Sequence, residues 1–188
     1  MHKPRPLTAR KIKNMSEELI QIETPFAFNE ENQREFDELI GRYPIKEAAM
    51  LPTLHLAQRQ AGYITPAVMK YVAEQLEVTV MKVKDVVTFY PMFFEEPVGE
   101  YVIRVCHTLP CALRDCKVVL DHLKAKLDTD IASETNLAKG TTADGKFTLM
   151  KVECLASCDV APVIMVNDDL YKNLTPEKVD ELLAKLAS

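Results

Sequence analysis

Apolar side chains in the first half of the chain recur every three or four residues, as they do on one face of a helix. Proline and glycine interrupt this pattern, and the intervening segments predict four helices, over Glu30–Arg42, Lys46–Ala61, Pro66–Leu76 and Thr79–Phe89. Pro52 must either kink the second helix or lie in its first turn. Thr65 directly before Pro66 is typical of a helix start, with a capping hydroxyl followed by proline at the first helical position. We therefore expect a helical bundle in this half.

The pattern of apolar positions changes in the second half of the chain. Short runs rich in β-branched residues predict strands over Tyr101–Cys106, Phe147–Glu153 and Val163–Val166. Helical spacing returns over Pro110–Leu127 and from Pro176 to about Leu186. The order of strand, helix, two strands and helix indicates a small mixed sheet flanked by helices, so the expected fold class is α+β.

These patterns divide the chain into three parts. We expect a flexible basic arm over residues 1–28, the helical bundle over 29–97 and the α/β domain over 98–188, with Pro97 and Gly99 marking the second boundary. The first sixteen residues contain Lys and Arg but no acid. Organellar transit segments share this composition, so the start of the chain is interpreted as a flexible arm or as such a segment.

Composition and charge limit the possible functions. A chain of 188 residues with 47% hydrophobic content can bury one moderate core or two small ones. No apolar run approaches the roughly 20 residues needed to cross a bilayer, so we expect a cytoplasmic protein without direct membrane insertion. The net charge of -5 argues against nucleic-acid binding, since phosphate requires a basic surface. Residues 64–87 have a helix-turn-helix pattern, but its second helix offers only Lys82 and Lys84.

Four of the five cysteines form two closely spaced pairs. Cys106 and Cys111 are separated by four residues, Cys154 and Cys158 by three, and each pair follows the end of a predicted strand. Two loops at one edge of the sheet could bring four thiolates together around the two irons of a [2Fe-2S] cluster. The predicted helix start near Cys111 would favour thiolate through its unpaired N–H groups and its dipole. Structural zinc, usually held by tighter pairs, is the second interpretation of this pattern, and unrelated core thiols are the third.

Two neighbouring residues are not expected to bind metal. Cys116 lies five residues beyond Cys111 in the predicted helix, about 140° around the helix axis, so a role as a small buried apolar residue is expected for it. His107 follows Cys106 but has no second histidine at metal-ligand spacing, and it is interpreted as a loop residue. A thiol–disulfide oxidoreductase is also disfavoured, because that chemistry generally uses two cysteines separated by two residues.

Four stretches of sequence, with both cysteine pairs among them, resemble the 24-kDa-type [2Fe-2S] subunit of respiratory complex I, the NADH:quinone oxidoreductase. They are LPTLHLAQRQAGYI at 51–64, VVTFYPMFFEEPVGEY at 86–101, VCHTLPCALR at 105–114 and TTADGKFTLMKVECLASCDVAPVIMVNDDLY at 141–171. The resemblance runs from about residue 49 to 175, roughly two thirds of the chain. It implies a helical bundle followed by a thioredoxin-like domain whose cluster is held by Cys106, Cys111, Cys154 and Cys158.

The resemblance also implies partners and a host complex. Subunits of this type work beside a larger flavoprotein that binds NADH and FMN, and their cluster exchanges electrons with that flavin. The chain has no glycine-rich dinucleotide fingerprint, so it is not expected to bind NADH alone and would be an enzyme only as a subunit of an NADH dehydrogenase. The complex would hold it at the cytoplasmic face of the membrane, or on the matrix side if organellar. NAD-linked hydrogenases and formate dehydrogenases use related subunits, and an isolated ferredoxin is a further alternative.

Two positions near the second cysteine pair carry separate expectations. The family commonly has glycine where this chain has Ala156, which predicts that the loop does not need a positive φ there. Pro162 precedes the last predicted strand. In thioredoxin-like folds a proline at this place often follows a cis peptide bond, and we expect one here; the alternative is a trans proline at the first residue of a strand.

Overall fold

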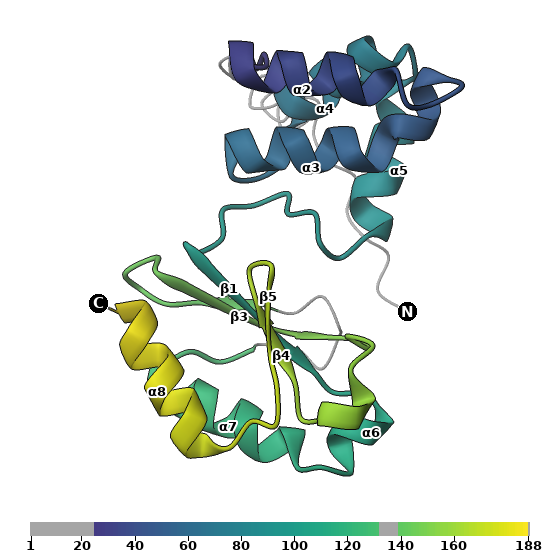
Figure 1. Ribbon diagram of the computed structural model, residues 1–188. Helices are drawn as coiled ribbons and strands as arrows, with labels where there is room; N and C mark the ends of the chain where they lie inside the picture. Colours follow the sequence, from purple (N-terminus) through teal and green to yellow (C-terminus); the bar gives the residue numbers. More distant parts are fainter. Residues whose placement is uncertain (1–24, 132–138, 188) are drawn as a thin grey trace, which may run out of the picture. The chain divides into compact units, whose positions relative to one another are not determined.

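Figure 1 shows the computed structural model, which describes residues 25–131 and 139–187. The basic arm expected over residues 1–28 lies almost entirely outside the described residues. The chain divides between Val86 and Val87 into two compact units. One unit is helical and the other is built on a sheet, which confirms the α+β fold class.

All four helices predicted for the first half are present. Their bounds are α2 (Glu30–Ile40), α3 (Met50–Ala61), α4 (Pro66–Leu76) and α5 (Val80–Phe89), with a short 3-10 helix, η1 (Lys46–Ala49), before α3. Pro52 lies in the first turn of α3. Backbone N–H groups in the first turn make no hydrogen bond within the helix, so the absence of an N–H in proline costs nothing there. The Thr65 hydroxyl accepts a hydrogen bond from the Val68 N–H at 3.2 Å, which confirms the predicted cap of α4.

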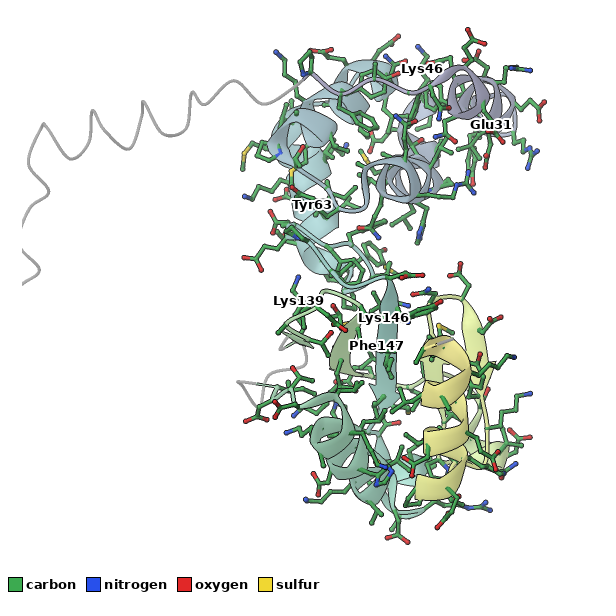
Figure 2. All side chains as sticks on the ribbon, turned by 90° about the vertical axis from the view of Figure 1, so that its left-hand side faces the viewer. Glu31, Lys46, Tyr63, Lys139, Lys146 and Phe147 are labelled. Carbon is green, nitrogen blue, oxygen red and sulfur yellow. The ribbon has the colours of Figure 1, made fainter. Side chains whose placement is uncertain are left out.

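Buried apolar side chains of α3 and α4 stabilise the helical unit. Leu54, Val68 and Val72 are at most 1% exposed, and burial of each such side chain contributes about 1.5–3 kcal/mol. At the surface, Lys46 (labelled in Figure 2) contacts the Glu77 carboxylate at 2.6 Å and connects η1 with the end of α4. Exposed ion pairs contribute little to stability, so the packed side chains dominate.

The second unit is built on a five-stranded mixed sheet. Its strands are β1 (Tyr101–Cys106), β2 (Lys139–Thr141), β3 (Phe147–Val152), β4 (Ile164–Val166) and β5 (Asp169–Tyr171), arranged in the order β2-β3-β1-β4-β5. β1 and β3 are parallel neighbours, and the other pairs are antiparallel. The sequence predicted β1, β3 and β4 but not β2 and β5, because three residues are too few to show an alternating pattern.

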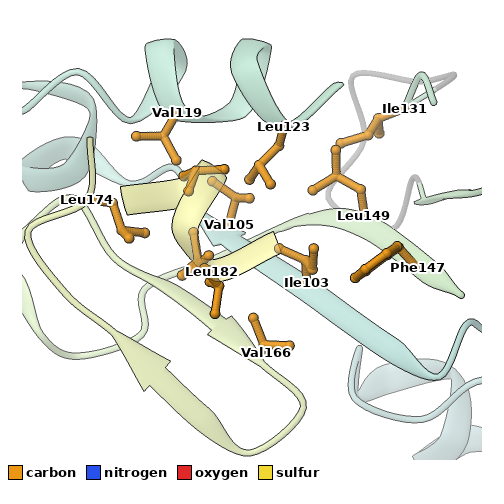
Figure 3. Packing of buried hydrophobic residues seen from close by; sticks show 12 residues of the cluster. Ile103, Val105, Val119, Leu123, Ile131, Phe147, Leu149, Val166, Leu174 and Leu182 are labelled. Atoms are coloured by element: carbon orange, nitrogen blue, oxygen red, sulfur yellow. The ribbon is translucent and has the colours of Figure 1, made fainter. Parts of the chain in front are cut away.

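Two helices, α7 (Cys116–Leu127) and α8 (Pro176–Ala187), pack on the sheet (Figure 3). Alternate residues of a strand point to the same face, and Ile103 and Val105 of β1 therefore both join this core. They pack with Leu149 of β3, Leu123 of α7 and Leu182 of α8. This continuous apolar core fixes the position of β1 and β3, whose ends carry the cysteine loops.

The helix predicted over Pro110–Leu127 is wrong as a single element. It is interrupted after α6 (Leu109–Ala112), and α7 begins only at Cys116. The Asp115 N–H donates to the Ala112 carbonyl at 3.3 Å, which closes a tight turn. Asp115 then adopts a left-handed conformation with φ of 61°, which aspartate tolerates better than most residues. The apolar stripe did not reveal this break because both pieces remain helical.

The contact between α7 and α8 gives an expected pH dependence. The Asp180 carboxylate accepts hydrogen bonds from the His122 ring at 2.8 Å and from Lys126 at 3.1 Å. These bonds, the one with His122 first, lower the pKa of Asp180. A lowered pKa stabilises the fold above the ordinary aspartate value of about 3.9, and this contribution is lost as the pH falls through the folded value.

Asp180→Asn should therefore unfold at a lower temperature than the unchanged chain at neutral pH. The two unfolding temperatures should converge below the lowered pKa that Asp180 has in the folded chain, because the carboxylate is then protonated in both states. Thermal unfolding followed by circular dichroism over a pH series measures this difference. A difference that stays constant from neutral to strongly acid pH would contradict the assignment.

Candidate metal centre

The sheet brings the two cysteine loops to the same edge, as predicted. β1 ends at Cys106 and β3 ends at Val152, and these two residues are paired in the parallel register. Parallel strands end at the same edge of a sheet, so the loops that follow β1 and β3 both begin at this edge. The loop after β1 leads to Cys111, and the loop after β3 carries Cys154 and Cys158.

The first pair is buried. Cys106 and Cys111 are each 1% exposed. Burial alone would raise the pKa of Cys106, but hydrogen bonds from the Thr108 hydroxyl, the backbone N–H groups of Leu155 and Thr108, and the Cys111 thiol together lower its pKa. Burial, and then donation of its proton to Cys106, raise the pKa of Cys111 to about 11. Burial is the first cause of this raised pKa, and the effect expected of the helix start near Cys111 stays a prediction.

The second pair is exposed and close together. The sulfur atoms of Cys154 and Cys158 are 4.0 Å apart. The Ala156 N–H donates to the Cys154 sulfur at 3.3 Å. The hydrogen bond from Cys158 to Cys154 raises the pKa of Cys158.

The sequence predicted backbone donors only at the helix start near Cys111, and not the full set of N–H groups directed at three of the sulfurs. Cys106 receives the N–H groups of Thr108 and Leu155, Cys111 receives that of Val163, and Cys154 receives that of Ala156. Hydrogen bonds of this kind favour thiolate over thiol. No side-chain pattern in the sequence marks them, because every residue type except proline supplies a backbone N–H.

Cys116 lies closer to the candidate pairs than expected. The predicted angle of about 140° from Cys111 assumed one unbroken helix, and the turn between α6 and α7 removes that assumption. Cys116 belongs to the same buried cluster as Cys106 and Cys111, with Ala161 and Val163. It is 5% exposed, which confirms a small buried residue. Burial, followed by the nearby Cys106, raises its pKa.

The prediction for Ala156 is wrong. Its φ is 55°, so the loop between Cys154 and Cys158 does require the left-handed conformation that glycine adopts without cost. This conformation directs the Ala156 N–H at the Cys154 sulfur. The alanine therefore carries the steric cost of about 1–2 kcal/mol that its Cβ imposes there.

Ala156→Gly should consequently stabilise the second unit. The steric gain of about 1–2 kcal/mol exceeds the added entropy of the unfolded chain, which costs about 0.4–1 kcal/mol. Denaturant unfolding should show a net gain of roughly half a kcal/mol or more. Ala112→Gly is the matched control in α6, where glycine should instead destabilise by about 0.5–1 kcal/mol. Equal destabilisation by both changes would contradict this account.

The Ala161–Pro162 peptide bond is cis, which confirms the prediction. The next residue, Val163, accepts a hydrogen bond from the Cys106 N–H at 3.3 Å and donates its own N–H to the Cys111 sulfur. The segment after Pro162 thus supports both buried cysteines.

The four thiols are arranged as two pairs on two loops. Among residues 25–131 and 139–187, no group of three or more His, Cys, Asp or Glu is placed to hold a single metal ion. A [2Fe-2S] cluster takes two protein thiolates at each iron, which matches two pairs. The backbone N–H groups around the sulfurs suit a negatively charged cluster as well. The residues present therefore fit this cluster.

Comparison with known proteins supports this interpretation. The profile of the thioredoxin-like [2Fe-2S] ferredoxin family matches residues 36–187. A subunit of the NADH-quinone oxidoreductase of Rickettsia bellii is 42% identical over 166 residues, which cover 87% of this chain and 95% of that protein. The subunit of the same name from Mycobacterium bovis is also 42% identical, over 80% of this chain. The alignment spans only 57% of that longer mycobacterial protein.

A solved structure shows the same fold at low sequence identity. The air-oxidised NAD+-reducing [NiFe]-hydrogenase aligns with 74% of this chain and 23% of its own chain, with a TM-score of 0.61 and 18% identity. Within the described ranges, no helix is both long and apolar enough to cross a membrane. From the family profile and the 42% identical relatives, we conclude that this chain belongs to the thioredoxin-like [2Fe-2S] ferredoxin family.

Proposed function

We propose that this chain is an electron-transfer subunit that holds one [2Fe-2S] cluster on Cys106, Cys111, Cys154 and Cys158. When bound, the cluster would exchange single electrons with the FMN of an NADH-oxidising flavoprotein partner. The observation that carries the proposal is the convergence of both cysteine loops at the ends of the parallel strands β1 and β3.

The chain's own residues prepare the site in two ways. Backbone N–H groups of Thr108, Leu155, Val163 and Ala156 donate to the sulfurs of Cys106, Cys111 and Cys154, and such donors suit the negative charge of a cluster. Burial of Cys106 and Cys111 excludes water from one side of the site. The exposed pair, Cys154 and Cys158, leaves the other side accessible to a partner. A site with one buried and one exposed side suits electron exchange between proteins.

The helical part of the chain is proposed to bind the flavoprotein partner. The domain assignment behind this proposal is a helical bundle over residues 29–97 and the cluster domain over 98–188. Several large apolar side chains are exposed on its helices and their connections: Tyr43, Ile45, Val80 and Met81. Removing this part should weaken binding of the partner before it lowers cluster content. Unchanged binding by a chain beginning near residue 98 would contradict this role.

Three kinds of host complex are candidates for a subunit of this type. The curated relatives at 42% identity are named as subunits of NADH-quinone oxidoreductase, which favours respiratory complex I over an NAD-linked hydrogenase or formate dehydrogenase. In complex I the chain would lie on the cytoplasmic side of the membrane, or the matrix side in an organelle. The hydrogenase likeness, at 18% identity, concerns the fold alone.

Purification of the native complex through a tag on this chain tests the proposal. Mass spectrometry should identify a larger flavin-binding protein in the same complex. Addition of NADH should then reduce the cluster, as seen by electron paramagnetic resonance, and the Cys154→Ser complex should lose that signal. A chain that purifies alone and whose spectrum does not respond to NADH in the presence of cell extract would overturn the proposal.

A further inference from the structure

Exposure divides the five cysteines into two classes. Cys106, Cys111 and Cys116 are at most 5% exposed, whereas Cys154 and Cys158 are exposed. A dissolved oxidant must touch a sulfur atom to react with it. In the cluster-free chain, therefore, the second pair is open to oxidants and the three buried thiols are protected.

The exposed pair has the geometry to close on itself. Its sulfur atoms are 4.0 Å apart, and a disulfide requires about 2.05 Å. Residues 153–157 between β3 and the short helix η2 (Cys158–Val160) form no helix or strand. Rotation of the two cysteine side chains and small shifts of this loop can close the gap without breaking a sheet hydrogen bond.

We propose that Cys154 and Cys158 form a reversible disulfide in the cluster-free chain, and that this disulfide blocks cluster insertion until a thiol reductant cleaves it. The inference rests on the proposed function, since it concerns two of the four proposed ligands. It adds a site of reversible covalent modification, at which low-molecular-weight disulfides are the oxidants.

The reaction is two thiol–disulfide exchanges. The thiolate of one cysteine attacks a low-molecular-weight disulfide, forms a mixed disulfide and releases one small thiolate. The second cysteine then attacks the bonded protein sulfur, forms the Cys154–Cys158 bond and releases the other small thiolate. The protons of the two protein thiols end on the two released small thiols. Two electrons pass from the protein to the oxidant, which is reduced, and a dithiol reverses both steps.

Charge at the site predicts which oxidants react best. Asp159 follows Cys158 directly and repels negative charge there, and Glu153 precedes Cys154. An anionic disulfide such as oxidised glutathione should therefore react more slowly than the neutral 2-hydroxyethyl disulfide, and salt should reduce the difference. Equal rates with both oxidants at low salt would contradict this effect of charge.

The direct test uses the cluster-free 188-residue chain and 2-hydroxyethyl disulfide. Thiol titration should show the loss of two of the five thiols, and peptide mass spectrometry should find Cys154 bonded to Cys158. Cys158→Ser should stop at a mixed disulfide on Cys154, while the matched control Cys116→Ser should still form the bond. A bond that includes Cys106 or Cys111, loss of all five thiols, or no bond at all would overturn the inference.

A second measurement separates this inference from the proposed function. The reduced and oxidised chains are each supplied with ferrous iron and sulfide, and cluster formation is followed by absorbance. The reduced chain should load at once, and the oxidised chain should load only after dithiothreitol is added. If the reduced chain does not load, the proposed function fails while the disulfide result stands. If the oxidised chain loads equally fast before dithiothreitol is added, the block on insertion is wrong.

Discussion

Replacement of Cys154 by serine should remove the cluster from the protein. Serine preserves the size of the side chain but supplies a hydroxyl, which does not ionise near neutral pH and is a poor substitute for thiolate at iron. We expect bound iron and sulfide to fall more than about tenfold, because loss of residues that merely support metal ligands already costs about 10–100-fold in metal affinity. Iron and sulfide analysis with visible absorption measures the loss.

Cys116→Ser is the control for this experiment. It makes the same exchange at a buried thiol of the cluster that contains Cys106 and Cys111, but outside the proposed ligand set. Its absorption spectrum and iron content should match those of the unchanged chain, although a buried hydroxyl can lower stability. Loss of the cluster in Cys116→Ser with retention in Cys154→Ser would refute the ligand assignment.

Gly99→Ala should destabilise the sheet unit by about 2–3 kcal/mol, because overpacking of this severity cannot be relieved by side-chain movement. A Cβ at Gly99 would lie 2.7 Å from the carbonyl carbon of Phe147 and 2.9 Å from the carbonyl carbon and oxygen of Lys146. Phe147, the first residue of β3, and Lys146, which precedes it, are both labelled in Figure 2. The Gly99 N–H also donates to the Thr148 hydroxyl at 2.6 Å, so the chain cannot move away freely.

Gly41→Ala is the control substitution in the helical unit. Its Cβ would meet the Glu38 carbonyl oxygen at 3.5 Å, an ordinary contact, and its φ of -62° suits alanine. Alanine there should leave stability unchanged or raise it by less than about 1 kcal/mol. Denaturant unfolding measures the stability of both variants. If Gly99→Ala is as stable as Gly41→Ala, the backbone at Gly99 lies farther from Lys146 and Phe147 than the distances above indicate.

Sequence periodicity predicted the elements that carry a repeated apolar pattern. The helices α2 to α5 and α8 and the strands β1, β3 and β4 were all located from such patterns, since each buries one face or both. β2 and β5 are edge strands of only three residues. They are too short to show an alternating pattern, although each pairs with the strand next to it in the sequence. The break between α6 and α7 is a turn in which Asp115 adopts a left-handed conformation, and apolar periodicity does not reveal such a turn.

The position of the cysteine loops was predicted from the sequence, but the surroundings of the sulfurs were not. Spacing placed both cysteine pairs after strands, and the parallel pairing of β1 with β3 then brings the two loops to one edge. The positive φ of Ala156 was missed. Alanine is unfavourable in that conformation, so its presence suggested that the loop does not need a positive φ at this position. The buried position of Cys116 beside Cys106 depends on the same turn at Asp115 that periodicity could not show.

Metal and sulfide content of the purified 188-residue chain tests the central claim most directly. Chain purified without oxygen should contain two irons and two acid-labile sulfides per molecule, as one binuclear cluster requires, and essentially no zinc. One zinc per chain without labile sulfide would contradict the account, because four cysteines satisfy a structural zinc equally well.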